Sequence, residues 1–175
     1  MAIDPDREFK PIAIALLTVS DTRGPDEDTS GDILADRITG AGHTLAARAI
    51  EKDDVDAIVR RLTAWIDDDG IDAIISTGGT GLTGRDVTPE ALDRIKDKDI
   101  PGFGELFRWI SFQTIGTSTV QSRALAVLAR GTYIFALPGS NGAVKDGWDS
   151  ILAEQLDSRN RPCNFVELMP RLKEK

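Results

Sequence analysis

A glycine-rich segment holds the residues of this sequence whose types and spacing best suit chemistry. An apolar run at residues 71–75 precedes four glycines, which occupy positions 78, 79, 81 and 84. Glycine allows a ligand to approach the main chain closely, and the N–H groups at a helix start bind anions. Thr88 and Pro89 are typical of an N-cap and a first helical residue. Asp86 lies inside this loop, and a carboxylate beside a phosphate site is best explained by a metal ion between the two groups.

Two standard phosphate motifs fit this loop only in part. Residues 79–84 match G-x-G-x-x-G, but the dinucleotide fingerprint also needs an acidic residue at the end of a second strand about 20 residues on. The sequence indicates no strand in residues 98–105. The same glycines have the P-loop spacing, but Arg85 and Asp86 stand where that motif has Lys and Ser or Thr. A purely structural turn would need fewer glycines, so we expect a ligand-binding loop of another kind.

Further candidate residues follow two other apolar runs, at 12–19 and 132–137, which are typical of buried strands. They are Ser20 and Asp21 after the first run, and Pro138, Gly139 and Ser140 after the second. Ligands of open α/β sheets bind at the carboxyl ends of the strands. Asp21 either belongs to such a site or simply forms an Asx-turn. Asp53 likewise either takes part in chemistry or caps the helix that follows it.

Strand and helix patterns alternate along the chain. Strands are expected at 12–19, 43–50, 71–75, 124–129 and 132–137. Helices are expected from Thr29 as N-cap to residue 41, at 55–66 behind Asp53 or Asp54, and at 89–98, 103–110 and 144–152. The alternation predicts an α/β fold, a three-layer α/β/α sandwich with a mostly parallel sheet and one antiparallel strand pair. Trp109 and Phe112 lie off the apolar stripe of their helix, which indicates a subunit interface or a second packed layer.

Length and charge limit the class of protein. A chain of 175 residues predicts a single domain over 1–175, with a loose arm at 1–10 and a tail at 158–175. The net charge of −8 argues against a nucleic-acid partner and against an anionic membrane surface. No apolar run reaches 18 residues, and residues 1–10 do not form a signal peptide, so we expect a cytoplasmic protein without a membrane partner. Cys163 is the single cysteine, which excludes an internal disulfide.

Six motifs in order along the chain resemble those of the MoaB/Mog family of molybdenum cofactor biosynthesis proteins. They are Leu17-Thr-Val-Ser-Asp21, Asp28-Thr-Ser-Gly31, Ser76-Thr-Gly-Gly-Thr-Gly81, Arg85-Asp-Val-Thr-Pro-Glu90, Pro101-Gly-Phe-Gly-Glu105 and Leu137-Pro-Gly139. The resemblance runs from about residue 10 to residue 167. Residues 116–123 and 157–165 are similar to the MoaB branch rather than the Mog branch.

This resemblance implies a molybdopterin-binding fold that assembles as a homotrimer or homohexamer, with molybdopterin, ATP and other cofactor-biosynthesis proteins as partners. The Mog-type reaction is adenylylation of molybdopterin by Mg-ATP, and its two catalytic aspartates correspond to Asp86 and, by register, Asp53. Lys52 replaces the proline that precedes the second aspartate in active members. The MoaB branch also includes members thought to bind without catalysing, so a non-catalytic molybdopterin carrier is the alternative. A related module acts on nucleotides, but it usually carries a further domain.

The expected site follows from these assignments. Asp86 and Asp53 are the expected catalytic residues and the ligands of Mg²⁺, which would bridge ATP phosphates and offset the repulsion between anions. The amides of the glycine loop are expected to orient a phosphate. The expected substrate-binding residues are Ser20, Asp21, Thr77, Gly78, Gly79, Thr80, Gly81, Ser122, Pro138, Gly139 and Ser140.

Overall fold

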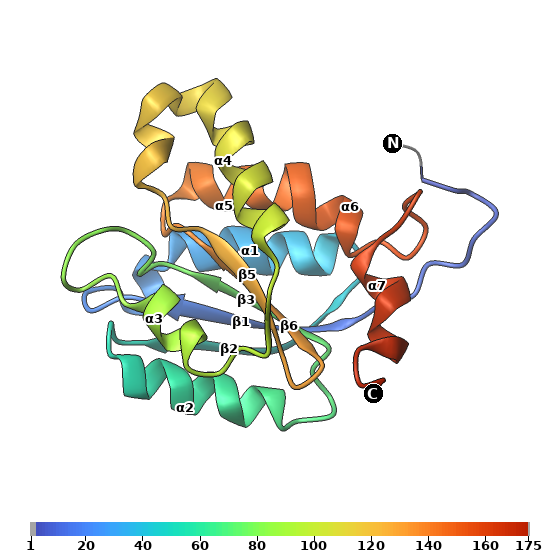
Figure 1. The fold of residues 1–175 in the computed structure, drawn as a ribbon, viewed down its shortest axis with the longest axis horizontal. Helices are drawn as coiled ribbons and strands as arrows, with labels where there is room; N and C mark the ends of the chain where they lie inside the picture. Colours follow the sequence, from blue (N-terminus) through green and yellow to red (C-terminus); the bar gives the residue numbers. More distant parts are fainter. Residues whose placement is uncertain (1–2, 175) are drawn as a thin grey trace.

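A six-stranded sheet runs through the middle of the computed structural model, which describes residues 3–174 (Figure 1). The strands are β1 (Ala13–Val19), β2 (Thr44–Glu51), β3 (Ala73–Thr77), β4 (Lys98–Asp99), β5 (Leu125–Ala129) and β6 (Thr132–Leu137). Their order is β2-β1-β3-β6-β5-β4, and β2, β1, β3 and β6 are parallel. The predicted class, a mostly parallel α/β sheet, is confirmed. β5 pairs antiparallel with both β6 and β4, so the sheet has two antiparallel pairs where one was predicted.

The burial of each strand follows its sequence pattern. β3 and β6 are buried along their whole length, and β1 is buried at all but its first residue. Such continuous apolar runs belong to strands that are covered on both faces. β2 alternates between exposed and half-buried residues and lies at one edge of the sheet. β4 was missed because it consists of two exposed residues, Lys98 and Asp99, and has no apolar pattern.

Helices cover both faces of the sheet (Figure 1). One layer contains α1 (Thr29–Gly40), α4 (Pro101–Ile115), and α5 (Asn141–Gly147), which continues through a π-helical turn, Trp148–Leu152, into α6 (Ala153–Gln155). The opposite layer contains α2 (Val55–Ile66) and α3 (Thr88–Asp93). The 3-10 segments are Pro25–Glu27, Gly116–Gln121 and Met169–Arg171, and α7 is Phe165–Leu168. The sequence prediction of a helix over 89–98 was too long, because β4 begins at Lys98.

Two helix starts differ from the sequence prediction, and a third decides between its two alternatives. Asp28, not Thr29, caps α1, since its Oδ1 accepts the Gly31 N–H at 3.0 Å. Asp54 caps α2, so Asp53 is not the cap. Thr88 does not cap α3 either, because its hydroxyl donates to the Gly78 carbonyl at 2.9 Å. Two of the side chains expected to cap helices therefore face the glycine loop region instead.

The chain ends pack against each other. The N–H of Asp4 donates to the Arg159 carbonyl at 3.0 Å, and the N–H of Lys10 donates to Ser158 Oγ at 2.8 Å. Arg7 also pairs with Glu167 in α7. The described part of the arm is thus attached rather than loose, because the tail supplies hydrogen-bond partners that the sequence does not reveal. Residues 1, 2 and 175 lie outside the described part. No helix within residues 3–174 has the length and apolar character needed to cross a bilayer.

The outer face of α4 carries exposed aromatic side chains. Trp109 is 66% exposed and Phe112 is 50% exposed in the single chain. A second packed layer within the chain, one of the two explanations offered for these residues, is therefore wrong. The other explanation, a subunit interface, stays a prediction.

Candidate functional site

Loops at the carboxyl ends of β1, β3 and β6 enclose a polar pocket of about 470 Å³. The segments that line it are residues 19–23, Asp53, residues 78–81, Thr83, residues 85–86 and residues 138–140. An apolar pocket of about 400 Å³ adjoins it. The two pockets share Thr80, Gly81, Pro138 and Ser140 as lining residues. They therefore form one site with a polar and an apolar half, at the sheet edge that the sequence predicts.

Close packing explains two glycines of the loop. Gly78 and Gly79 have positive φ angles of 100° and 65°. A Cβ on Gly78 would lie 2.2 Å from the Val19 carbonyl oxygen, and one on Gly79 would lie 2.4 Å from Thr88 Oγ1 and 3.1 Å from Asp53 Oδ1. At either position, a larger residue would have a strained backbone conformation, and its Cβ would clash with these atoms. The glycines thus let the loop pack directly against β1 and against the Asp53 carboxylate.

Asp86 and Asp53 both line the polar pocket, but their environments differ. The Thr83 hydroxyl donates to Asp86 Oδ2 at 2.6 Å and the Thr83 N–H donates to it at 2.9 Å. The hydroxyl hydrogen bond lowers the pKa of Asp86 and favours its charged form. Burial, followed by the nearby Asp21 carboxylate, raises the pKa of Asp53. The negative charge of Asp86, which lines the same pocket, raises it further.

This pair fits a magnesium ion that also contacts a phosphate ligand. Within residues 3–174, no group of three or more His, Cys, Asp or Glu side chains converges as a ready-made metal site. Mg²⁺ usually takes one or two carboxylates and completes its shell with substrate phosphates and water. Asp53 and Asp86 are the residues that would hold the ion in this way.

Arg123 fixes the loop that carries Asp86. Its Nε donates to the Gly81 carbonyl and its Nη2 to the Asp86 carbonyl, each at 2.7 Å, and its Nη1 pairs with Glu90. Its backbone N–H donates to the Thr80 carbonyl at 3.1 Å. Its guanidinium is thus occupied by the protein and is not free to bind a phosphate. It acts as a clamp on the loop instead.

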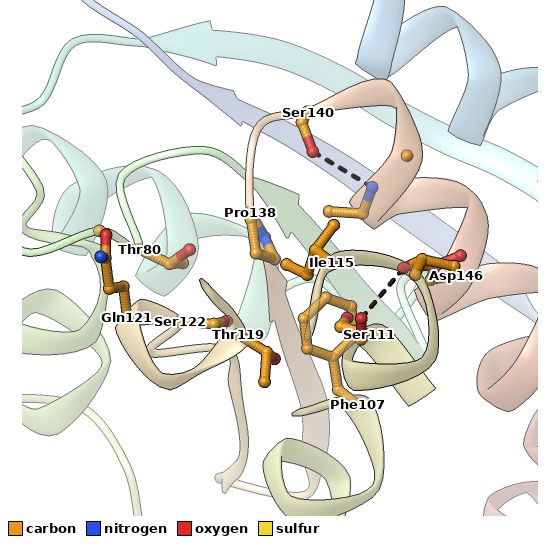
Figure 2. A pocket seen from close by; sticks show the side chains of 14 residues that line it. Thr80, Phe107, Ser111, Ile115, Thr119, Gln121, Ser122, Pro138, Ser140 and Asp146 are labelled. Atoms are coloured by element: carbon orange, nitrogen blue, oxygen red, sulfur yellow. Dashed lines mark hydrogen bonds between the residues drawn. The ribbon is translucent and has the colours of Figure 1, made fainter. Parts of the chain in front are cut away.

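Figure 2 shows the apolar pocket. Phe107 and Ile115 enter it from α4, and Pro138 faces them from the end of β6. The polar side chains of its lining are Thr80, Ser111, Thr114, Thr119, Gln121, Ser122, Ser140 and Asp146. Apolar walls with a few hydroxyl and amide groups suit a flat heterocycle. The sequence did not reveal this pocket, because Phe107 belongs to the apolar stripe of α4, and such a stripe indicates a core face.

The structure gathers most of the predicted substrate-binding residues at this site. The polar half contains Ser20, Asp21, Gly78, Gly79 and Gly139, the shared wall contains Thr80, Gly81, Pro138 and Ser140, and the apolar half contains Ser122. Thr77 lines neither half. It is buried, and its hydroxyl donates to the Pro138 carbonyl at 3.2 Å, so it supports the loop from below. In the polar half, the polar residues that the sequence prediction missed are Thr22, Arg23, Thr83 and Arg85.

One glycine amide is not available for the expected phosphate contact. The Gly78 N–H donates to the Leu137 carbonyl at 3.0 Å, which joins the start of the loop to β6. The Gly81 amide helps to lower the pKa of Asp86. The amides of Gly79 and Thr80 remain candidates for binding a phosphate.

The sequence matches the family described as "Probable molybdopterin binding domain" over residues 15–158. The chain belongs to the MoaB/Mog family. Molybdenum cofactor biosynthesis protein B of Escherichia coli strain K12 is 51% identical to it over 158 residues, which are 90% of this chain and 93% of that protein. The corresponding protein of Bacillus subtilis is 42% identical over 142 residues, or 81% and 84% of the two chains.

Solved structures of the family share the fold. A crystal structure of a molybdenum cofactor biosynthesis protein B superposes with a TM-score of 0.86 at 34% identity, and covers 97% of this chain and 100% of the other. The tungsten cofactor synthesizing protein MoaB of Pyrococcus furiosus has a TM-score of 0.79 at 32% identity, with coverages of 94% and 99%. The resemblance to the MoaB branch that the motifs indicated is confirmed.

Proposed function

We propose that this chain acts in molybdenum cofactor biosynthesis by binding molybdopterin and adenylylating it with Mg-ATP. Its family membership supports the pathway and the ligand. The observation that carries the reaction is the continuity of the two pockets. A polar half with two carboxylates meets an apolar half of a size that suits a ring, and the two share four lining residues. Such a site suits a molecule that joins a heterocycle to a phosphate.

The reaction joins two phosphates. An oxygen of the molybdopterin phosphate attacks the α-phosphorus of ATP, a new P–O bond forms, and the bond from that phosphorus to the bridging oxygen breaks. Pyrophosphate leaves with the bonding electrons. Repulsion between the anions is the main obstacle, and Mg²⁺ held by Asp53 and Asp86 would supply the neutralising charge. The Gly79 and Thr80 amides would orient one phosphate for in-line attack.

The alternative is a molybdopterin carrier without turnover. Two structural observations favour it. Oδ2 of Asp53 already accepts the Asp21 N–H at 3.0 Å, and the pKa of Asp53 is raised by burial and by Asp21. Both features reduce its availability as a metal ligand. Lys52, where active members have proline, precedes this residue.

Product formation separates the two functions. The chain is incubated with molybdopterin and Mg-ATP, and the mixture is analysed by mass spectrometry. If the chain is an adenylyltransferase, adenylylated molybdopterin and an equal amount of pyrophosphate should form, and both should depend on Mg²⁺. Bound molybdopterin without product, under conditions where an established Mog enzyme turns over, would support the carrier. Light scattering on the same sample tests the predicted homotrimer or homohexamer, which the exposed face of α4 supports. The cytoplasmic location stays a prediction.

A further inference from the structure

Arg23 is held in the polar pocket by uncharged partners. It follows β1, and its Nη1 donates to Ser30 Oγ at 3.0 Å and to the Gly139 carbonyl at 3.1 Å. The side chain is half-buried and lines the polar pocket. Within residues 3–174, no carboxylate forms an ion pair with Arg23, whereas most arginines of the chain have one. The guanidinium is therefore fixed in place while its charge is not neutralised by a neighbouring residue.

The position of this charge is set by the glycine loop and by the loop after β6. A Cβ on Gly139 would lie 3.2 Å from the Gly78 Cα and 3.7 Å from Arg23 Nη1. Gly139 is thus flanked by the glycine loop on one side and by the guanidinium on the other. Because Asp53 and Asp86 line the same pocket, one ligand can reach the carboxylates, the loop amides and Arg23 together.

The unused donors of Arg23 match a phosphate. Both of its side-chain hydrogen bonds run through Nη1, and no acceptor among the described residues takes Nε or Nη2. These two groups form the edge of the guanidinium that binds carboxylates and phosphates in a bidentate manner. Arg123 differs, since its Nε, Nη1 and Nη2 all bind the protein. Arg85 lines the same pocket but is exposed and has no fixed hydrogen bond among the described residues.

We propose that Arg23 binds the anionic end of the ligand in the polar pocket, a phosphate or diphosphate group, through Nε and Nη2. This inference rests on the proposed function. Within that function, the Asp53 and Asp86 carboxylates repel the phosphate groups of the ligand, and Arg23 is the residue that binds them. Arg23 is a substrate-binding residue in this account. Its contribution is electrostatic as well as geometric, so it depends on the salt concentration.

Isothermal titration of the full chain with pyrophosphate in the presence of Mg²⁺ tests the inference. Arg23→Gln removes the charge but keeps a group that can donate to the Gly139 carbonyl. We expect it to weaken pyrophosphate binding about tenfold or more, as the loss of a charge-assisted bidentate contact does. Arg23→Lys keeps the charge without the planar fork, and should fall between Arg23→Gln and the wild type.

The matched control is Arg60→Gln, which removes the same charge from an exposed position in α2, outside the pocket. It should weaken binding by less than about threefold, because an exposed side chain without fixed partners contributes little. Pyrophosphate affinity should also depend less steeply on salt in Arg23→Gln than in the wild type. Wild-type affinity in both Arg23 variants, with an unchanged melting temperature, would overturn the inference. If Arg23→Gln does not fold, the comparison of Arg23→Lys with the wild type decides.

Failure of this inference and failure of the proposed function give different experimental results. If pyrophosphate binding depends on Arg23 but no adenylylated product forms, the anion site stands and the enzymatic proposal fails. If product forms and Arg23→Gln leaves the KM for ATP unchanged, the inference alone fails. Adenosine, which has no phosphate, should bind the wild type and Arg23→Gln equally, and a loss of adenosine binding in Arg23→Gln would show a general disturbance of the pocket and count against the inference.

Discussion

Asp21 and Asp53 hold each other by two reciprocal hydrogen bonds. The Asp21 N–H donates to Asp53 Oδ2 at 3.0 Å, and the Asp53 N–H donates to Asp21 Oδ1 at 3.2 Å. The pair joins the loop after β1 to the loop after β2. Asp21 thereby fixes the main chain of Asp53 and leaves Oδ1 of Asp53 beside Gly79. The sequence offered two explanations for each residue. Asp21 either formed an Asx-turn or belonged to the site, and Asp53 either capped a helix or belonged to the site. The structure shows that the two residues form one hydrogen-bonded pair.

This relationship predicts different effects for two substitutions of Asp21. Asp21→Ala removes the acceptor for the Asp53 N–H, and we expect the rate of adenylyl transfer to fall about tenfold, the equivalent of one hydrogen bond. Asp21→Asn keeps an acceptor oxygen and should stay within about threefold of the wild type. The product assay measures both rates. An Asn variant as slow as the Ala variant would show that the charge of Asp21 matters rather than its hydrogen bond.

Arg123→Gln should loosen the loop that carries Asp86. The substitution removes the contacts of the guanidinium with Gly81, Asp86 and Glu90. The contacts with Gly81 and Asp86 are to backbone carbonyl groups, and only a long cationic side chain can reach both. We expect a loss of about 1–3 kcal/mol in the free energy of unfolding. Trypsin should also cleave faster after Arg85, which is exposed in this loop. Urea titration and timed proteolysis are the measurements.

Arg94→Gln is the control for the Arg123 experiment. Arg94 pairs with Asp56 at 2.7 Å, but both side chains are largely exposed. Exposed ion pairs contribute little to stability, so this variant should unfold and be cleaved like the wild type. Equal resistance of Arg123→Gln and Arg94→Gln to trypsin would contradict the clamp.

His43 predicts how stability depends on pH. The residue is 6% exposed, and its ring lies beside Phe9 and Trp148 and accepts the Ile12 N–H at Nδ1. Burial lowers the pKa of His43, and the nearby Asp157 opposes this shift only in part. The folded state thus disfavours the proton, whereas the unfolded chain takes it up near the ordinary value of 6.5.

The direction in which stability changes with pH follows from this difference in proton binding between the folded and unfolded states. The contribution of His43 to stability is fully present above pH 6.5 and is lost as the pH falls from 6.5 toward the lower pKa of the folded state. Urea unfolding across this window should show a steeper loss for the wild type than for His43→Asn, which cannot titrate. Parallel loss in the two proteins would mean that His43 does not govern stability in this range. The low pKa of Asp157, which Arg159 holds down, acts at lower pH.

Much of the fold could be predicted because its signals are local. The buried strands and the long amphipathic helix α2 appear in the sequence as apolar runs and as a stripe at helical spacing. Asp86 could be identified because it lies in the glycine loop itself. Asp53 could not be separated from a helix cap by spacing alone, since Asp54 is equally placed, and only the resemblance to the family favoured it.

The features of the fold and of the site that could not be predicted depend on contacts between segments far apart in the sequence. Thr29 satisfies the local rule for a cap, but Asp28 takes the role because it also binds Thr18 and Arg48 inside the protein. The apolar pocket needs α4, the segment Gly116–Gln121 and the start of α5 together, and no single stretch of sequence encodes it. Arg23 stands in an ordinary turn, and its importance appears only when Gly139, more than a hundred residues later, lies beside it.

In the proposed function, Asp86 supports the chemistry while the apolar pocket retains the ring of molybdopterin. The most direct test is a single-turnover assay with molybdopterin and Mg-ATP, in which bound molybdopterin and adenylylated product are measured in the same samples. The wild type should form product, and Asp86→Asn should bind molybdopterin within about threefold of the wild type but form product at least about a hundredfold more slowly. Product formation by Asp86→Asn at the wild-type rate would contradict the account.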